Sequence, residues 1–188
     1  MKFSITTAFA IAIAFGTQMT SALIVPTDQA DGVYEASIDA NGEILAGTEV
    51  KLLKAFDRRS LEKDSLPAIT PNRLNSRQLP SPSTRCNQRW LNQSDYNCLM
   101  GQVDNFGNNQ DIPSNTARWY TCGSAVIYMC NYSSMGNPVR GSEFRQASAL
   151  MNSHCGVVKA GWVIIDEWNK DYGRDTVGVR ICRSQTPV

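Results

Sequence analysis

The chain has 188 residues, of which 19% are charged, and its formal net charge is +1. From Gln78 to the C-terminus there are ten Lys or Arg and eight Asp or Glu, which leaves +2 for that part. A balance this small does not give the clustered basic face of nucleic-acid-binding proteins, so we expect no nucleic-acid partner. It also gives no electrostatic reason for strong attraction to a membrane.

The N-terminus has the three regions of a secretory signal peptide. Lys2 precedes an apolar run that ends at Phe15, and Thr20-Ser21-Ala22 supplies small residues suited to signal peptidase. The run is much shorter than the ~20 apolar residues that span a bilayer, and no second long run follows. We therefore predict that residues 1–22 are a signal peptide, that the protein is secreted, and that it has no stable membrane insertion. A buried N-terminal helix is the alternative.

The region 23–77 contains no cysteine and divides into a patterned part and a polar part. Alternation of apolar and polar residues over 32–39 predicts a half-buried strand. Ala40-Asn41-Gly42 then predicts a tight turn into a second strand within 43–53. Residues 57–84 are polar, rich in Pro, Ser, Arg and Asn, and are expected to form a linker.

The linker carries two basic sites that resemble targets of a Kex2-type processing protease. One is the dibasic pair Arg58-Arg59, and the other is the segment Leu74-Asn75-Ser76-Arg77. Exposed, extended segments are where processing proteases cut. We therefore expect residues 23–77 to be a propeptide and linker, cut after Arg59 or Arg77. The alternative is that these arginines have no role.

All six cysteines lie in the remaining region, 78–188, which also holds all four tryptophans. An even number of cysteines in a short secreted segment predicts a disulfide framework, with fifteen possible pairings. A Cys122–Cys130 bond is disfavoured, because eight residues along a single strand would separate the two by more than about 20 Å. A zinc site is disfavoured by the absence of a Cys-x-x-Cys pair, and we expect no metal and no cofactor. The expected disulfide cysteines are Cys86, Cys98, Cys122, Cys130, Cys155 and Cys182.

The cysteine-rich region alternates helical and extended patterns. Ser94 is the expected N-cap of a first helix that ends near Gly107, Gly123 marks a bulge, and Gly156 stops a second helix. Two helices on one face of an antiparallel sheet would bury both apolar stripes. The predicted class is α+β, a small disulfide-stapled sandwich. The expected elements are helices at 94–107 and 142–155, one or two strands within 116–131, strands at 160–165 and 176–182, and a turn at 168–171.

Several segments together resemble the secreted cysteine-rich effector candidates of filamentous fungi. The resemblance spans nearly the whole chain and implies an effector that acts in virulence or competition. Cys98 departs from the pattern because it lies inside a helix rather than at its end, which leaves its pairing open. The order of elements is also similar to the small α/β sandwich of fungal killer toxins, on architecture alone. The segments are Asp31-Gly32-Val33-Tyr34, Asp39-Ala40-Asn41-Gly42, Leu91-Asn92-Gln93-Ser94-Asp95, the run 121–132, Cys155-Gly156, Ala160-Gly161-Trp162 and Tyr172-Gly173.

Candidate catalytic groups are few. His154 is the only histidine and a candidate general base, with Glu143 or Glu167 as a partner. However, a polar residue at a helix end is ordinary capping. Asp166-Glu167 and Asp171 are paired carboxylates of the kind used in glycoside hydrolysis, but acidic residues are common in turns. We therefore assign no catalytic residue.

Other surface features can be read as modification or contact sites. Asn92 and Asn131 begin N-glycosylation sequons, and Asn92 at a helix start is alternatively a cap. Trp119 and Trp162 lie in predicted strands and are expected in the core. Trp168, in a predicted turn, is the expected contact residue for a partner.

The leading hypothesis is a secreted fungal effector or toxin-like protein that binds a host or competitor target. The alternative is a small extracellular hydrolase, either a nuclease or a carbohydrate-active enzyme. A structural protein of the producer's cell wall is a third possibility.

Overall fold

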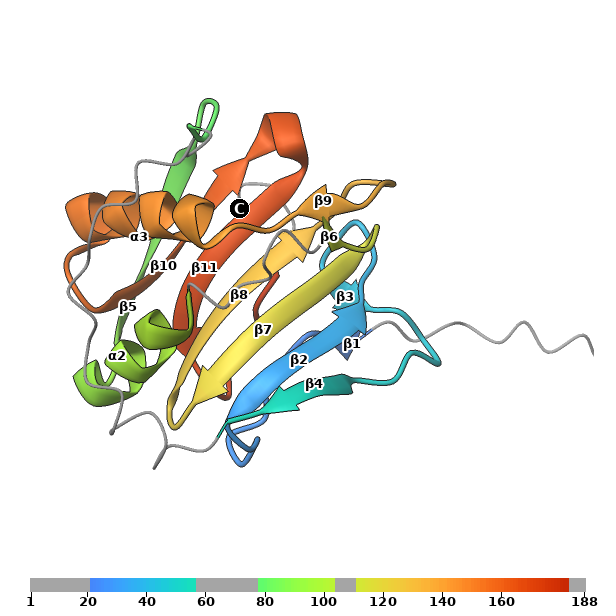
Figure 1. Ribbon diagram of the computed structural model, residues 1–188, viewed down its shortest axis with the longest axis horizontal. Coiled ribbons are helices and arrows are strands. Elements are labelled where there is room, and N and C mark those ends of the chain that lie inside the picture. Colours follow the sequence, from blue (N-terminus) through green and yellow to red (C-terminus); the bar gives the residue numbers. More distant parts are fainter. Residues whose placement is uncertain (1–20, 57–77, 104–110, 183–188) are drawn as a thin grey trace, which may run out of the picture.

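The computed structural model describes residues 21–56, 78–103 and 111–182. Its centre is a seven-stranded, fully antiparallel sheet in the order β4-β2-β7-β8-β11-β10-β5 (Figure 1). Two short ribbons, β1–β3 and β6–β9, lie outside this sheet. The main strands are β2 (Gly32–Ser37), β4 (Lys51–Ala55), β5 (Ser83–Trp90), β7 (Thr116–Cys122), β8 (Ala125–Asn131), β10 (Lys159–Ile165) and β11 (Lys170–Thr176). The ribbons are β1 (Ser21–Ala22), β3 (Glu43–Ile44), β6 (Asp111–Ile112) and β9 (Asn137–Pro138).

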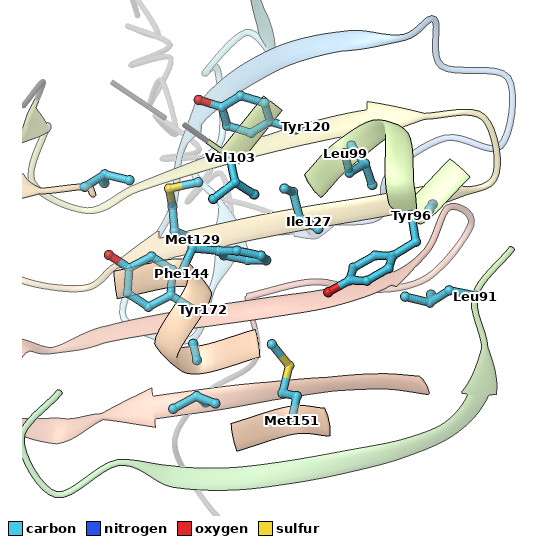
Figure 2. Close-up of a cluster of buried hydrophobic side chains, with 14 of the residues drawn as sticks. Leu91, Tyr96, Leu99, Val103, Tyr120, Ile127, Met129, Phe144, Met151 and Tyr172 are labelled. Carbon is cyan, nitrogen blue, oxygen red and sulfur yellow. The ribbon is translucent and has the colours of Figure 1, made fainter. Parts of the chain in front are cut away.

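Helices α2 (Gln93–Gln102) and α3 (Gly141–Cys155) both cover one face of the sheet (Figure 1). Between helices and strands lies the larger apolar core, shown in Figure 2. The helix side chains of this core recur one turn apart, as an amphipathic helix requires. Its principal members are Tyr96, Leu99, Val103, Phe144 and Met151 on the helical side and Tyr120, Ile127, Met129, Val163 and Tyr172 on the strands.

The first helix begins earlier than expected. Asn92, not Ser94, is its N-cap, and the Asn92 side chain accepts a hydrogen bond from the Asp95 backbone N–H at 3.1 Å. The second helix ends as predicted at Gly156, whose φ of +103° suits glycine. The predicted end of the first helix at Gly107 lies outside the described residues.

The opposite face of the sheet is covered by the N-terminal segment and by the last described residues. Val25 donates a backbone hydrogen bond to Val179 at 3.3 Å, and Ile181 donates one to Leu23 at 2.9 Å. These residues close a second apolar core that contains Tyr34 stacked on Trp119, with ring centroids 5.8 Å apart. The segment 21–56 therefore belongs to the same folded unit as the cysteine-rich region.

The prediction for the last strand is wrong. The strand runs over Lys170–Thr176, and Val177 lies in a turn rather than in a strand over 176–182. β11 is central but carries four charged residues, each almost fully buried, so no apolar alternation marks it. Hydrogen bonds and ion pairs to other residues of the protein offset the free-energy cost of burying these charged side chains. These residues are Lys170, Asp171, Arg174 and Asp175.

The segment 116–131 forms a hairpin, one of the two readings left open. β7 and β8 pair from Thr116↔Asn131 to Cys122↔Ala125, and Gly123 lies in the turn instead of marking a bulge. Cys122 and Cys130 are indeed not bonded to each other. They lie on different strands, however, so the predicted distance along a single strand is not the reason that they are unbonded.

All six cysteines are paired, which confirms the predicted disulfide framework. The bonds are Cys86–Cys155, Cys98–Cys122 and Cys130–Cys182. They tie α3 to β5, α2 to β7, and the last described residues to β8. A mixed α/β protein with two helices on an antiparallel sheet and three disulfides is thus confirmed over the described residues. In that part of the chain, no helix is both long enough and apolar enough to cross a membrane.

Candidate functional site

The most exposed aromatic ring in the described chain belongs to Trp90, the last residue of the edge strand β5. Its side chain is 67% exposed, although tryptophan is usually largely buried. The ammonium of Lys159 lies 4.7 Å from the centroid of the indole. Val157, 64% exposed, precedes Val158, which bonds the backbone next to Trp90. Trp90, Val157 and Lys159 are called the Trp90 surface below.

The backbone under Trp90 is fixed on both sides. Arg89 makes a two-pronged ion pair with the buried carboxylate of Asp175, with both N···O distances 2.8 Å. Leu91 is buried and donates its backbone N–H to the Val158 carbonyl at 2.9 Å. The exposed indole therefore stands on a backbone that is held in place before any partner arrives.

The turn that carries Val157 is strained and tightly supported. Val158 has a φ of +60°, which costs a β-branched residue on the order of 1–3 kcal/mol. Arg174, fully buried, donates to the carbonyls of Gly156 at 3.1 Å and Lys159 at 2.7 Å, the two ends of this turn. Such strain persists only where the surroundings fix the backbone.

The buried guanidinium of Arg174 is in turn positioned by both helices. It donates to the Tyr96 hydroxyl at 2.9 Å, the Ser148 hydroxyl at 3.3 Å and the Asn152 side-chain oxygen at 2.7 Å. These are neutral partners, so the charge is satisfied by hydrogen bonds rather than by an ion pair. The network connects the helical layer to the turn beneath the Trp90 surface.

A covalent link completes the support. The Cys86–Cys155 disulfide joins β5 to the residue just before the turn. It passes over Gly161, where an added Cβ would lie 3.1 Å from the Cys155 sulfur and 2.7 Å from the Arg85 carbonyl oxygen. Glycine is needed here because these atoms occupy the space of a side chain. The Trp90 surface is thus rigid, apolar and cationic, which suits recognition.

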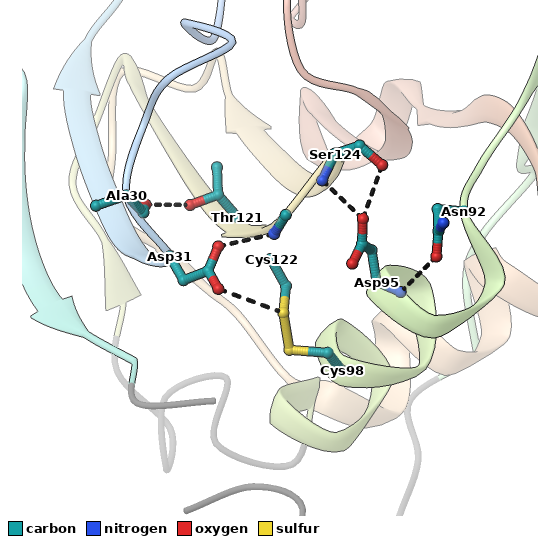
Figure 3. The surroundings of a disulfide bond; sticks show 9 residues. Ala30, Asp31, Asn92, Asp95, Cys98, Thr121, Cys122 and Ser124 are labelled. Atoms are coloured by element: carbon teal, nitrogen blue, oxygen red, sulfur yellow. Dashed lines mark hydrogen bonds between the residues drawn. A yellow bond between two sulfur atoms is a disulfide. The ribbon is translucent and has the colours of Figure 1, made fainter. Parts of the chain in front are cut away.

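Three separate segments of the chain meet at a second place, the turn between β7 and β8 (Figure 3). Asp31 accepts the Gly123 N–H at 2.7 Å, and Asp95 accepts the Ser124 N–H and hydroxyl, both at 2.8 Å. The Cys98–Cys122 disulfide lies between the two carboxylates. These hydrogen bonds hold the turn in place, so this cluster is a structural clamp.

The candidate carboxylate Glu143 is fully buried in the helix-side core. Its Oε2 accepts from the Tyr172 hydroxyl at 2.5 Å and from the Lys170 ammonium at 3.2 Å, while its Oε1 has no hydrogen-bond partner. Burial, followed by the charge of Glu143, raises the pKa of Tyr172 well above its usual value. Because Glu143 is fully buried with its partners, its carboxylate cannot reach a substrate.

Asp171 lies on the other face of β11, and its oxygen Oδ2 accepts from the Tyr132 hydroxyl at 3.1 Å. Burial, with a further contribution from the charge of Asp166, raises the pKa of Asp171 to about 8. The same burial, with the nearby Asp171 charge, raises the pKa of Tyr132. Asp171 was expected in a turn, and the structure instead places it inside a strand.

The other candidate catalytic groups do not converge. Asp166 and Glu167 are exposed in the short 3-10 helix Asp166–Trp168, and His154 is exposed at the end of α3, with its Nδ1 2.9 Å from the Leu150 carbonyl. Among the described residues, no group of three or more His, Cys, Asp or Glu is arranged to hold a metal ion.

The two glycosylation candidates differ in exposure. Asn92 is exposed, and its glycosylation stays a prediction. Asn131 is 1% exposed, and its amide nitrogen donates to the carbonyls of Ile112, Pro113 and Met135 at 3.3, 2.8 and 3.0 Å. A glycan on this nitrogen would break these hydrogen bonds, so the folded structure disfavours Asn131 as an acceptor, and its glycosylation stays a prediction. The processing candidates Arg59 and Arg77 lie outside the described residues.

The expected contact residue Trp168 is only partly exposed. It packs against the helix-side core, with the Lys170 ammonium 5.2 Å from its ring centroid, and its role in binding stays a prediction. Trp119 is 1% exposed, and Trp162 packs against the second core. Trp90 was not predicted as a contact residue. Its exposure could have been inferred from its position at the end of a polar run without alternation, a pattern that is typical of an edge strand.

Comparison of the chain with protein-family models, with curated proteins and with solved structures found no match.

Proposed function

We propose that the protein is a secreted effector or toxin-like protein that acts by binding a macromolecule of a host or competitor, and that the Trp90 surface is its contact site. The observation that carries this proposal is the 67% exposure of Trp90 on a rigid support. The three disulfides support an extracellular setting, because such bonds persist in oxidising compartments. The toxin-like part also rests on the packing of two helices on an antiparallel sheet.

The physical reason is that rigid exposed aromatics are efficient binding groups. Tryptophan residues are enriched among interface positions whose truncation costs about 2 kcal/mol or more. Association also costs free energy for every side chain or loop that becomes ordered. Arg89, Leu91 and Arg174 fix the backbone in advance, so this cost is reduced at the Trp90 surface.

The buried titratable groups support recognition rather than hydrolysis. Glu143, Asp171 and Asp175 each lie inside the protein and hydrogen-bond to side chains of the same chain. A general acid or base must reach its substrate within hydrogen-bond distance. These three carboxylates therefore contribute more to the fold than to a reaction.

The test compares the full-length secreted protein with Trp90→Ala. Met135→Ala is the matched control, because Met135 is 72% exposed and lies in the β8–β9 connection, across the molecule from the α3–β10 turn (Figure 1). The readout is the response of plant leaves and of competing microbes to the purified proteins. We expect Trp90→Ala to need at least about tenfold more protein for the same response. Met135→Ala should match the wild type.

Two results would contradict the proposal. One is an unchanged response from Trp90→Ala whose thermal unfolding matches the wild type. The other is a response that disappears in His154→Ala or Glu167→Gln while binding persists, accompanied by turnover of a polysaccharide or nucleic-acid substrate. That second outcome would identify a hydrolase.

A further inference from the structure

The side chains around the Trp90 surface are of one charge. β5 and residues 153–159 together carry Arg85, Arg89 and Lys159, and they contain no Asp or Glu. Arg89 is paired with Asp175 from β11, whereas Arg85 is exposed. The Lys159 ammonium therefore lies beside an apolar patch formed by Trp90 and Val157. Arg85 pairs with Trp162 farther along β5 and, next to the helix-facing Cys86, points to the opposite face of the strand.

The strand that carries this patch is an edge of the sheet. β5 pairs with β10 on one side, and its other side has no strand partner among the described residues. The first half of the strand is regular, from Ser83↔Ile164 to Cys86↔Gly161, and an irregularity follows before Trp90↔Lys159. Over Ser83–Cys86 the outer backbone groups can accept a further extended segment.

On this basis we propose that the Trp90 surface binds an extended protein segment that places an apolar side chain on Trp90 and Val157 and an acidic side chain at Lys159. This proposal rests on the proposed function and specifies its partner. An acidic partner is favoured over a second copy of this chain, because pairing two β5 edges would bring like charges together.

A protein segment is also favoured over a carbohydrate. Sugar rings bind by stacking on an open aromatic face, and here the Lys159 ammonium lies over the Trp90 ring. The neighbouring exposed group is the aliphatic Val157, which has no polar atom to direct a sugar hydroxyl. Apolar and acidic side chains match both parts of the surface.

The experiment selects binders from a random 12-residue peptide library displayed on phage. The full-length oxidised protein is the bait, and Trp90→Ala is the bait for counter-selection. We expect the enriched peptides to combine Asp or Glu with Val, Ile, Leu or an aromatic residue. Binding of a selected synthetic peptide, followed by fluorescence anisotropy, should weaken at least about tenfold in Trp90→Ala and remain unchanged in Met135→Ala.

Charge-reversal variants test whether the partner is acidic, independently of whether the site is at Trp90. Lys159→Glu should weaken binding of an acidic peptide, and the same peptide with Lys in place of Glu should regain binding to this variant. Enrichment of basic or neutral peptides would overturn the acidic assignment but leave the proposed function standing if Trp90→Ala still abolishes the biological response. Enrichment unaffected by Trp90→Ala, or selective binding of oligosaccharides instead of peptides, would also overturn the proposal.

Discussion

The two parts of the sheet are held by different forces. Residues 78–182 contain all three disulfides, and each bond links a helix or the C-terminal residues to a strand. The segment 21–56 has no cysteine, yet its strand β2 lies inside the sheet between β4 and β7. A strand can therefore lie inside this sheet without a disulfide that attaches it. The difference shows that cysteine content divides this chain chemically but does not divide it into folding units.

Non-covalent contacts hold the N-terminal segment in place. Six residue pairs join β2 to β7, the Glu35 carboxylate bonds the largely buried Arg118 guanidinium at 2.5 Å, and Tyr34 stacks on Trp119. Leu23 and Val25 are at most 1% exposed. These contacts bury apolar side chains from both regions in one core, so we expect the two regions to fold together.

Removing the cysteine-free segment should have the largest effect. Residues 78–188 alone would leave β7 as an unpaired edge and would expose the face of Trp119 on which Tyr34 stacks in the full-length protein. The loss should exceed the roughly 5–15 kcal/mol by which domains are usually stable. We expect this fragment to show no cooperative thermal unfolding by near-UV circular dichroism.

The matched control is the full-length protein cut once at a protease site inserted between residues 56 and 78. Its two pieces should co-elute in size exclusion and separate on a non-reducing denaturing gel, because no disulfide joins them. A native-like, cooperative transition of residues 78–188 alone would show instead that the N-terminal segment is dispensable. Processing at Arg59 or Arg77 would then release a separately stable domain, as the sequence first suggested.

The second prediction concerns the disulfide that anchors the C-terminal residues against the N-terminal segment. Cys130–Cys182 closes a loop with a sequence separation of 52 and anchors the residues that bond to Leu23 and Val25. Replacing both cysteines by Ala should lower the free energy of unfolding by about 4 kcal/mol on the chain-entropy estimate. Hydrogen exchange should also accelerate at the Val25 and Ile181 amides.

The control for this prediction is the double replacement of Cys86 and Cys155. It removes a disulfide from the β5 edge of the sheet and should leave exchange at Val25 near the wild-type rate. Equal acceleration in both variants would mean that the disulfides act only on global stability.

Sequence patterns located the helices and the disulfide framework but failed where tertiary contacts override local pattern. The helix at 142–155 was found because Phe144, Ala147 and Met151 recur on one face. β11 was missed because its Lys, Asp and Arg side chains are buried beside partners more than ten residues away, such as Glu143 and Asn152. No local rule predicts such burial.

The candidate site was missed for a related reason. From sequence, the exposure of a tryptophan follows only from the element expected around it, and this favoured Trp168 in an apparent turn. Exposure of Trp90 depends on β5 being an edge strand, which is decided by the order of strands in the sheet. The disulfide pairing was likewise left open because it depends on which elements the fold brings together.

The third prediction concerns the two buried carboxylates on opposite faces of the sheet. Glu143, on the helical face, has the Lys170 ammonium as its counter-ion, whereas Asp171 bonds a tyrosine hydroxyl. Burial raises the pKa of Asp171 to about 8 in the folded protein, against about 3.9 for an unfolded chain. Between these two values the unfolded state releases a proton that the folded state keeps. This stabilising contribution is therefore complete below about pH 4 and is lost as the pH rises towards 8.

Asp171→Asn should remove this pH dependence. The stability of the variant relative to the wild type should increase by a few kcal/mol between pH 4 and pH 8, measured by urea unfolding at a series of pH values. Asp111→Asn, which changes an exposed carboxyl on β6, is the control and should track the wild type. A constant difference between Asp171→Asn and the wild type across this range would contradict the assignment.

The smallest predicted effect tests the clamp where the two regions meet. Asp31 from the N-terminal segment and Asp95 from α2 hold neighbouring residues of the same turn. Asp31→Ala should lower the free energy of unfolding by about 1–2 kcal/mol, because the partly buried Gly123 N–H loses a charged acceptor. Asp28→Ala, an exposed carboxylate three residues earlier, should have almost no effect. If Asp31→Ala and Asp28→Ala have equal urea midpoints, the turn does not depend on the N-terminal segment. The two regions would then be joined mainly through the β2–β7 pairing.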